Sequence, residues 1–278
     1  MPQTFAARLA AAHASANSLV CIGLDPDPAR LPAGLSSLPE PLYAFNRRII
    51  DATRDIAAAY KPQIAFYSAV GAEAELAASI RYIRASAPHA LVILDAKRSD
   101  IGNTAAAYAR EAFDRYGADA VTVNPYMGED SVLPFLARSD RGAILLCRTS
   151  NPGARDFQDL LVDGRPLYRH VAARAAGHWN RNGNLMLVVG ATYPREMADL
   201  RAAHPELPFL VPGIGAQGGD LAATLAAGLN AAGTGLLINS SRAIIYAGAG
   251  DDAGSAGAIR AAAQQLRSGI NALRAAVR

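Results

Sequence analysis

The sequence predicts a closed (β/α)₈ barrel, in which eight parallel strands alternate with helices. Eight short runs of β-branched and apolar residues recur along the chain, and Ala-rich stretches with a helical pattern separate them. The chain has 278 residues, which is the usual length of one such barrel. We therefore expect a single barrel domain over residues 1–278, with an open sheet covered by helices on both faces as the alternative.

The expected strands are almost continuously hydrophobic, as strands are in parallel sheets that helices cover. They occupy residues 19–25, 58–66, 91–97, 119–125, 142–148, 185–191, 208–214 and 233–241. Clear helical patterns follow the first three strands, at 41–57, 74–87 and 104–117. The number of strand-plus-helix units favours a closed barrel over an open sheet.

The connection after the fifth strand is longer than a barrel needs. It spans residues 149–184 and contains a turn at Asp163–Gly164, followed by a helix over about 166–181. We expect this helical insertion to form a rim over the mouth of the barrel. An amphipathic helix is expected within the first 18 residues, and a terminal helix over 256–277.

Composition and charge narrow the class of function. The net charge of +3 fits either ordinary drift in an Ala/Arg-rich chain or a positive potential that attracts a phosphorylated anion. No Lys/Arg run or basic–aromatic alternation predicts nucleic-acid binding. No stretch approaches the length of a membrane span, and the N-terminus lacks a long apolar region. A cytoplasmic enzyme is the expectation.

The metal-ligating residue types are scattered. Cys21 and Cys147 each lie within an apolar run and fit neither a disulfide framework nor a zinc site, so we expect two small buried hydrophobic residues. The histidines are expected to be solvated rather than ligands; they are His13, His89, His170, His178 and His204. Trp179 is expected to anchor the inserted helix by packing.

Charged residues gather where the first three strands are expected to end. Residues two apart in a strand point to the same side, so Asp95 and Lys97 should project together at the carboxyl end of the third strand. Asp100 opens the following loop, Lys61 lies near the second strand, and Asp25 closes the first. Each alone could be a surface charge or an incidental ion pair. Together they predict a functional site, because burying many charges is costly unless they pair or serve a site.

A glycine-rich segment after the seventh strand predicts an anion site. In PGIGAQGGD (212–220), glycines let backbone N–H groups approach an anion closely, although a flexible turn is the alternative. The seventh and eighth loops are the usual phosphate site of such barrels. Arg242, just beyond the eighth strand, adds a bidentate donor, and the loop that carries Gln217 could close as a lid.

The stretch LDAKRSDIGNT (94–104) resembles the DxKxxDI signature of the orotidine 5′-phosphate decarboxylase family. The resemblance extends over nearly the whole chain, with LDPD at the first strand, TSNPGA after the fifth, PGIGAQGGD after the seventh and SSRAIIYA after the eighth. DxKxxD alone is shared with a wider group of phosphosugar enzymes, whereas the ordered set is specific. The length and the two longer loop segments look most like the longer bacterial branch, type 2.

The resemblance implies metal-free decarboxylation of orotidine 5′-phosphate to uridine 5′-phosphate, a step of pyrimidine nucleotide biosynthesis. Lys97 would donate the proton, within an alternating array of Lys61, Asp95, Lys97 and Asp100. No cofactor is implied. The resemblance also implies a homodimer, in which Asp100 enters the neighbouring subunit's site and Thr104 helps to hold the ribose across the interface.

The remaining substrate contacts also come from the resemblance. Asp25 would bind a ribose hydroxyl, and Gln217 and Arg242 would hold the phosphate. Ser150 would contact the amide edge of the pyrimidine, although the adjacent Thr149 could take that role.

Two other functions stay open. A phosphosugar decarboxylase or aldolase of the same DxKxxD group would use a divalent metal held by carboxylates, one of them on the second strand. The chain offers Lys61 there instead, which would repel a cation. A non-catalytic nucleotide-binding barrel would have lost part of the charged array, yet all four members are present.

Overall fold

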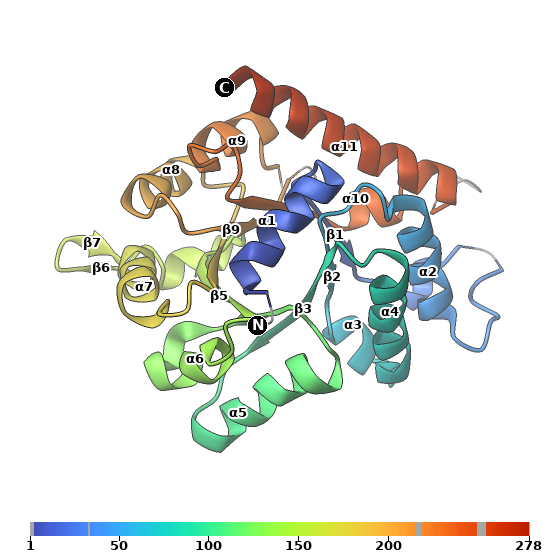
Figure 1. Ribbon diagram of the computed structural model, residues 1–278, viewed down its shortest axis with the longest axis horizontal. Helices are drawn as coiled ribbons and strands as arrows, with labels where there is room; N and C mark the ends of the chain where they lie inside the picture. The colour runs from blue at the N-terminus through green and yellow to red at the C-terminus, as the bar shows by residue number, and fades with distance from the viewer. Residues whose placement is uncertain (1–2, 33, 215–217, 249–253, 278) are drawn as a thin grey trace.

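Eight parallel strands form a closed barrel with helices around it (Figure 1). The computed structural model describes residues 3–32, 34–214, 218–248 and 254–277. The strands are β1 (Val20–Leu24), β2 (Ala59–Pro62), β3 (Leu91–Arg98), β4 (Ala120–Val123), β5 (Gly142–Arg148), β8 (Leu185–Val189), β9 (Phe209–Val211) and β10 (Leu236–Ser240). They pair in this order, and β10 closes the barrel against β1. The predicted (β/α)₈ barrel is confirmed.

Helices follow the strands and cover the outside of the barrel (Figure 1). They are α2 (Pro41–Thr53), α3 (Ala65–Ser68), α4 (Glu73–Ser86), α5 (Gly102–Arg110), α6 (Glu129–Leu136), α7 (Leu167–Arg174), α8 (Pro194–Ala203), α9 (Leu221–Gly228), α10 (Arg242–Ile245) and α11 (Ala256–Val277). π-Helical turns extend α5 through Glu111–Arg115 and α7 through Ala175–Trp179. Among the described helices, none has the length and apolar character needed to cross a membrane.

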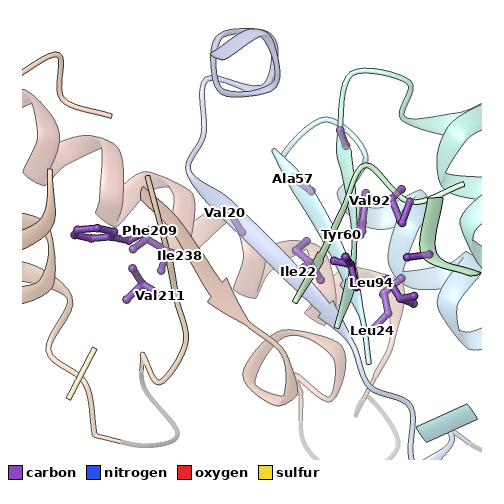
Figure 2. Packing of buried hydrophobic residues seen from close by; sticks show 14 of the residues in the cluster. Val20, Ile22, Leu24, Ala57, Tyr60, Val92, Leu94, Phe209, Val211 and Ile238 are labelled. Carbon is purple, nitrogen blue, oxygen red and sulfur yellow. The ribbon is translucent and has the colours of Figure 1, made fainter. Parts of the chain in front are cut away.

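Strand side chains alternate between two cores. Outward-facing residues such as Ile22, Tyr60 and Leu94 pack in the layer beneath the helices (Figure 2). Their neighbours, among them Cys21 and Ile93, belong to a separate cluster inside the barrel. This alternation decides which residues can face a ligand at the mouth of the barrel.

The N-terminal helix α1 (Phe5–Ala16) closes the bottom of the barrel, and in Figure 1 it lies across the middle of the molecule. Phe5 packs into the cluster inside the barrel. A Cβ added at Gly142 would lie 2.6 Å from the Phe5 ring, so the start of β5 needs a glycine for this close approach.

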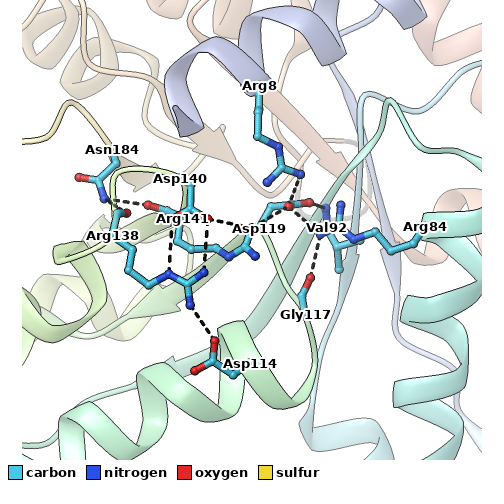
Figure 3. A network of polar contacts seen from close by, with 10 residues as sticks. All are labelled: Arg8, Arg84, Val92, Asp114, Gly117, Asp119, Arg138, Asp140, Arg141 and Asn184. Carbon is cyan, nitrogen blue, oxygen red and sulfur yellow. Dashed lines mark hydrogen bonds and ion pairs between the residues drawn. The ribbon is translucent and has the colours of Figure 1, made fainter. Parts of the chain in front are cut away.

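A buried aspartate connects several segments at the bottom of the barrel (Figure 3). The fully buried Asp119, just before β4, forms ion pairs with Arg8 of α1, with Arg84 at 2.6 Å and with Arg141 at 3.6 Å. Its other carboxylate oxygen accepts a hydrogen bond of 2.8 Å from the backbone N–H of Val92. The charge is compensated by these partners, which join α1 to three consecutive strand–helix units.

The insertion after β5 begins with a 3-10 turn at Pro152–Asp156 and continues with a two-stranded hairpin of β6 (Leu161–Val162) and β7 (Arg165–Pro166). Asp163 and Gly164 both have positive φ, at 50° and 74°, so the turn predicted there is confirmed. Trp179 is buried at the end of the inserted helix, as expected.

Two predictions about titratable residues have different outcomes. Cys21 and Cys147 are buried, and burial raises the pKa of each thiol to about 12, which confirms them as inert core residues. The prediction that all the histidines are solvated is wrong for His13. It is buried on α1, and its Nε2 has no hydrogen-bond partner among the described residues. Burial, with a smaller effect of Arg274, lowers its pKa to about 4.

Candidate active site

Polar side chains take the uppermost inward-facing positions of three neighbouring strands. In β2 and β3, Lys61 and Asp95 follow the inward-facing Ala59 and Ile93 at a spacing of two. In β4, Thr122 stands two residues after the inward-facing Ala120. The exposed fractions of Lys61, Asp95 and Thr122 are 5%, 7% and 1%. Strand alternation therefore gathers the three residues at the carboxyl end of the barrel.

The Asp95 carboxylate lies between two ammonium groups. Lys61 Nζ donates to Oδ2 at 2.8 Å, and Lys97 Nζ donates to Oδ1 at 2.7 Å. Burial tends to raise the pKa of Asp95, but the two lysines outweigh it and hold this pKa well below the usual range. Burial tends to lower the pKa of Lys61, but the charges of Asp95 and Asp25 outweigh it and raise the pKa. Both groups therefore stay charged around neutral pH.

The end of β3 departs from regular strand geometry. The β3–β4 register shifts between Leu94 and Arg98, and Lys97 has a φ of 45°, in the left-handed region. The predicted contact between Asp95 and Lys97 is confirmed, but a bulge forms it rather than simple alternation. The Lys97 side chain is 48% exposed and lines the cavity at this end of the barrel.

Asp25, directly after β1, has a buried carboxylate oxygen without a partner. Its Oδ1 accepts no hydrogen bond from the described residues. A Cβ added at Gly23 would lie 2.6 Å from the Cβ of Ser241, so the end of β1 packs closely against the segment after β10. A buried carboxylate oxygen without a partner at this place can accept a hydrogen bond from a ligand.

The loop after β5 is held by Gln158 of the insertion. Gln158 Oε1 accepts from the Thr149 backbone N–H at 2.9 Å, and its Nε2 donates to Thr149 Oγ1 at 2.9 Å. Thr149 Oγ1 in turn donates to Asn151 Oδ1 at 2.7 Å. The Thr149 hydroxyl is therefore engaged both as donor and as acceptor. Ser150 packs against Gly190, where an added Cβ would lie 2.8 Å from the Ser150 Cβ.

The residues of β2, β3, β4 and the loop after β5 line a cavity of about 410 Å³. Its polar wall consists of Lys61, Asp95, Lys97, Thr122, Thr149, Ser150, Asn151 and Gln158, and its apolar wall of Leu146, Val188, Leu210 and Pro212. The volume suits a small organic ligand. Among the described residues, no three His, Cys, Asp or Glu side chains come together in a way that could hold a metal ion.

Among the described residues, no hydrogen bond or ion pair joins Lys97 to the other predicted site residues Asp100, Thr104 and Arg242. Asp100 is partly exposed, and its Oδ1 accepts a hydrogen bond of 2.8 Å from the N–H of Ile101. Thr104 is exposed on α5, and Arg242 is exposed at the start of α10. Gln217 lies outside the described residues.

Sequence reasoning assigned no role to three polar residues of the cavity, Thr122, Asn151 and Gln158. Thr122 had a signal, because it is a polar residue at an inward position of an otherwise apolar strand. Gln158 had none, since nothing in the sequence relates it to the loop that begins nine residues earlier.

Comparisons with known proteins show which family the chain belongs to. A family model described as "Orotidine 5'-phosphate decarboxylase / HUMPS family" matches residues 18–259. The chain belongs to this family. The resemblance seen in the sequence motifs is thus confirmed.

Two relatives and one solved structure are similar to this chain over nearly their full length. The orotidine 5′-phosphate decarboxylase of Cellvibrio japonicus is 57% identical over 274 residues, which are 98% of this chain and 100% of that one. That of Azoarcus sp. is 58% identical over 270 residues, 97% and 99% of the two chains. The structure of Leishmania donovani OMP decarboxylase is 43% identical, with a TM-score of 0.84 over 98% of this chain and 99% of that chain.

Proposed function

We propose that the protein is a carboxy-lyase that converts orotidine 5′-phosphate to uridine 5′-phosphate in pyrimidine nucleotide biosynthesis. One observation carries the proposal: a buried carboxylate, Asp95, is held between Lys61 and Lys97 on the floor of the cavity. The names of the relatives, at 57% and 58% identity over nearly the whole chain, support the same reaction.

The chemistry asks for a fixed positive charge that can also deliver a proton. Breaking the bond between C6 and the carboxylate releases CO₂ and leaves the electron pair on C6 of the pyrimidine. The Lys97 ammonium, held in place by Asp95, would stabilise this pair through preorganised electrostatics and then protonate C6. Water would return the proton to Lys97. Lys61 would keep Asp95 ionised and fixed in place.

Residues of several loops would contact the substrate. Asp25, with its orphaned Oδ1, would accept a hydrogen bond from a ribose hydroxyl. Ser150 lines the cavity beside Thr149 and would contact the amide edge of the pyrimidine. Arg242 and Gln217 would hold the phosphate, whose binding energy would help to assemble the site.

A homodimer would complete the array of charges. Asp100 stands on a partly exposed loop, and no hydrogen bond or ion pair joins it to its own Lys97 in the described part of the chain, so it is available to the partner's site. Thr104, one helical turn further on, would reach the ribose of the same site. Exposed apolar side chains near the mouth, those of Ile101, Tyr126 and Met127, support a contact with a second copy.

The alternative function is that of a metal-dependent phosphosugar enzyme of the same DxKxxD group. The Lys61 ammonium favours the pyrimidine enzyme, because a positive charge on β2 would repel a divalent cation. The direct test mixes the protein with orotidine 5′-phosphate and follows the ultraviolet change as the carboxylate leaves. Turnover supports the proposal; no change with this substrate, together with metal-dependent turnover of a phosphosugar, would overturn it.

A further inference from the structure

We propose that Thr122 is a positioning residue for the decarboxylation. Its hydroxyl group binds the backbone N–H of Lys97 directly, and it binds the Asp95 oxygen that accepts from the Lys97 ammonium. Thr122 does not need to touch the substrate. The inference rests on the proposed role of Lys97 and extends it to a residue on the neighbouring strand.

The hydrogen bonds of the Thr122 hydroxyl are fully determined. Its oxygen lies 3.0 Å from the backbone nitrogen of Ala96 and 2.9 Å from that of Lys97, and both N–H groups can only donate. The single hydroxyl proton is therefore left for Asp95 Oδ1, at 2.8 Å. Thr122 is only 1% exposed, which leaves little room for water to replace any of these partners.

The two backbone hydrogen bonds stabilise an unusual conformation. In a regular strand, successive N–H groups point to opposite sides, so their convergence on one oxygen marks the departure from strand geometry. This is the place where the β3–β4 register shifts and where Lys97 has a φ of 45°. A residue with a side chain rarely adopts such a φ unless its surroundings hold it there. Thr122 supplies those surroundings.

The third hydrogen bond acts on the other end of Lys97. The Lys97 ammonium donates to Asp95 Oδ1, the same oxygen that receives the Thr122 proton. Lys61 holds Oδ2, so the plane of the carboxylate is set by three donors. Lys97 is long, flexible and half-exposed, and its direction depends on these two anchors. Removing the hydroxyl would release the backbone anchor and loosen the carboxylate that holds the ammonium.

Two substitutions distinguish the effect of the hydroxyl group from the effect of side-chain packing. Thr122→Val keeps the volume and removes the hydroxyl, whereas Thr122→Ser keeps the hydroxyl and removes a methyl group. If Thr122 positions Lys97, the valine variant should lose at least tenfold in kcat with little change in KM, and the serine variant should stay within about threefold of the wild type. If Thr122 only fills space, the order of the two variants is reversed.

Amide hydrogen exchange gives a readout that does not depend on activity. The amides of Ala96 and Lys97 should be protected in the wild type and in Thr122→Ser, and should exchange faster in Thr122→Val. Should the valine variant fail to fold, Thr122→Ala carries the same expectations for kcat and exchange.

The experiment includes Lys97→Ala in the same assay. A wild type without activity contradicts the proposed function, and an active Lys97→Ala variant contradicts the proposed role of Lys97. An active wild type, an inactive Lys97→Ala variant and a Thr122→Val variant with unchanged kcat and unchanged exchange overturn the role of Thr122 alone. Equal losses in the valine and serine variants would overturn it as well, because the hydroxyl would then not be the group that matters.

Discussion

The Lys61 ammonium donates a hydrogen bond of 2.8 Å to the Asp95 carboxylate, and both groups are buried at the carboxyl end of the barrel. Lys97 binds the second oxygen of the same carboxylate at 2.7 Å. Two positive charges thus share one negative charge, and of the three groups only Lys97 is half-exposed to solvent. Such an arrangement costs free energy to bury, and its components are strongly interdependent.

Asp95→Asn should therefore destabilise the fold as well as abolish turnover. The substitution leaves two ammonium groups facing a neutral amide, and the free energy of unfolding should fall by about 3 kcal/mol. Urea denaturation measures this change. The matched control is Asp55→Asn, which breaks the exposed ion pair with Arg260 and should cost less than about 1 kcal/mol. Equal costs at the two sites would contradict the strong coupling of the buried charges.

His13 should make the stability depend on pH. Its pKa is about 4 in the fold and 6.5 without burial, so the unfolded chain binds the proton more tightly between these values. The contribution of His13 is fully present above about pH 6.5 and is lost as the pH falls towards 4. The loss amounts to about 2 kcal/mol by pH 5.

His13→Leu provides the comparison. The free energy of unfolding, measured in urea at pH 7 and at pH 5, should fall less for this variant than for the wild type. Parallel pH profiles for the two proteins would mean that His13 is not held neutral by burial.

Gln158→Ala should weaken substrate binding more than the chemical step. It removes the two hydrogen bonds that hold Thr149, beside the proposed pyrimidine contact at Ser150. At roughly 1 kcal/mol for each bond, KM should rise about five- to thirtyfold while kcat changes little. Steady-state kinetics measure both constants, and Asp156→Ala, at an exposed position of the same segment, is the control. A fall in kcat at constant KM would point to a different role for Gln158.

Treatment with a chelator should leave turnover unchanged. Lys61 puts an ammonium group where a carboxylate ligand would be needed in a metal-dependent relative. The rate with orotidine 5′-phosphate, measured before and after incubation with EDTA, checks this expectation. Loss of the rate, and its return with added Mg²⁺, would favour the metal-dependent alternative.

The alternation of apolar residues predicted most of the fold and the gathering of Lys61 and Asp95, because a period of two decides what faces the inside of a barrel. Six of the eight strand predictions were too long, above all two of them: β2 covers 59–62 of the expected 58–66, and β9 covers 209–211 of 208–214. Hydrophobicity continues there beyond the last ladder hydrogen bonds. The terminal helix α11 was predicted with its observed bounds.

Other features depend on contacts between distant segments, which a single sequence does not display. His13 is buried because α1 packs against the barrel, and the bulge at Lys97 forms because Thr122 of the next strand accepts its N–H. The dimer, the roles of Asp100 and Thr104 within it, the single domain over residues 1–278 and the cytoplasmic location stay predictions.

The central claim is that Lys97 is the acid that protonates C6, and one comparison tests it most directly. Wild type and Lys97→Ala are mixed with orotidine 5′-phosphate under identical conditions, and the loss of the carboxylate is followed by ultraviolet absorbance. Binding of uridine 5′-phosphate is measured alongside to show that the variant is folded. We expect the variant to bind the nucleotide within a few-fold of the wild type and to turn over at least about 10³-fold more slowly. Turnover near the wild-type rate would contradict the account.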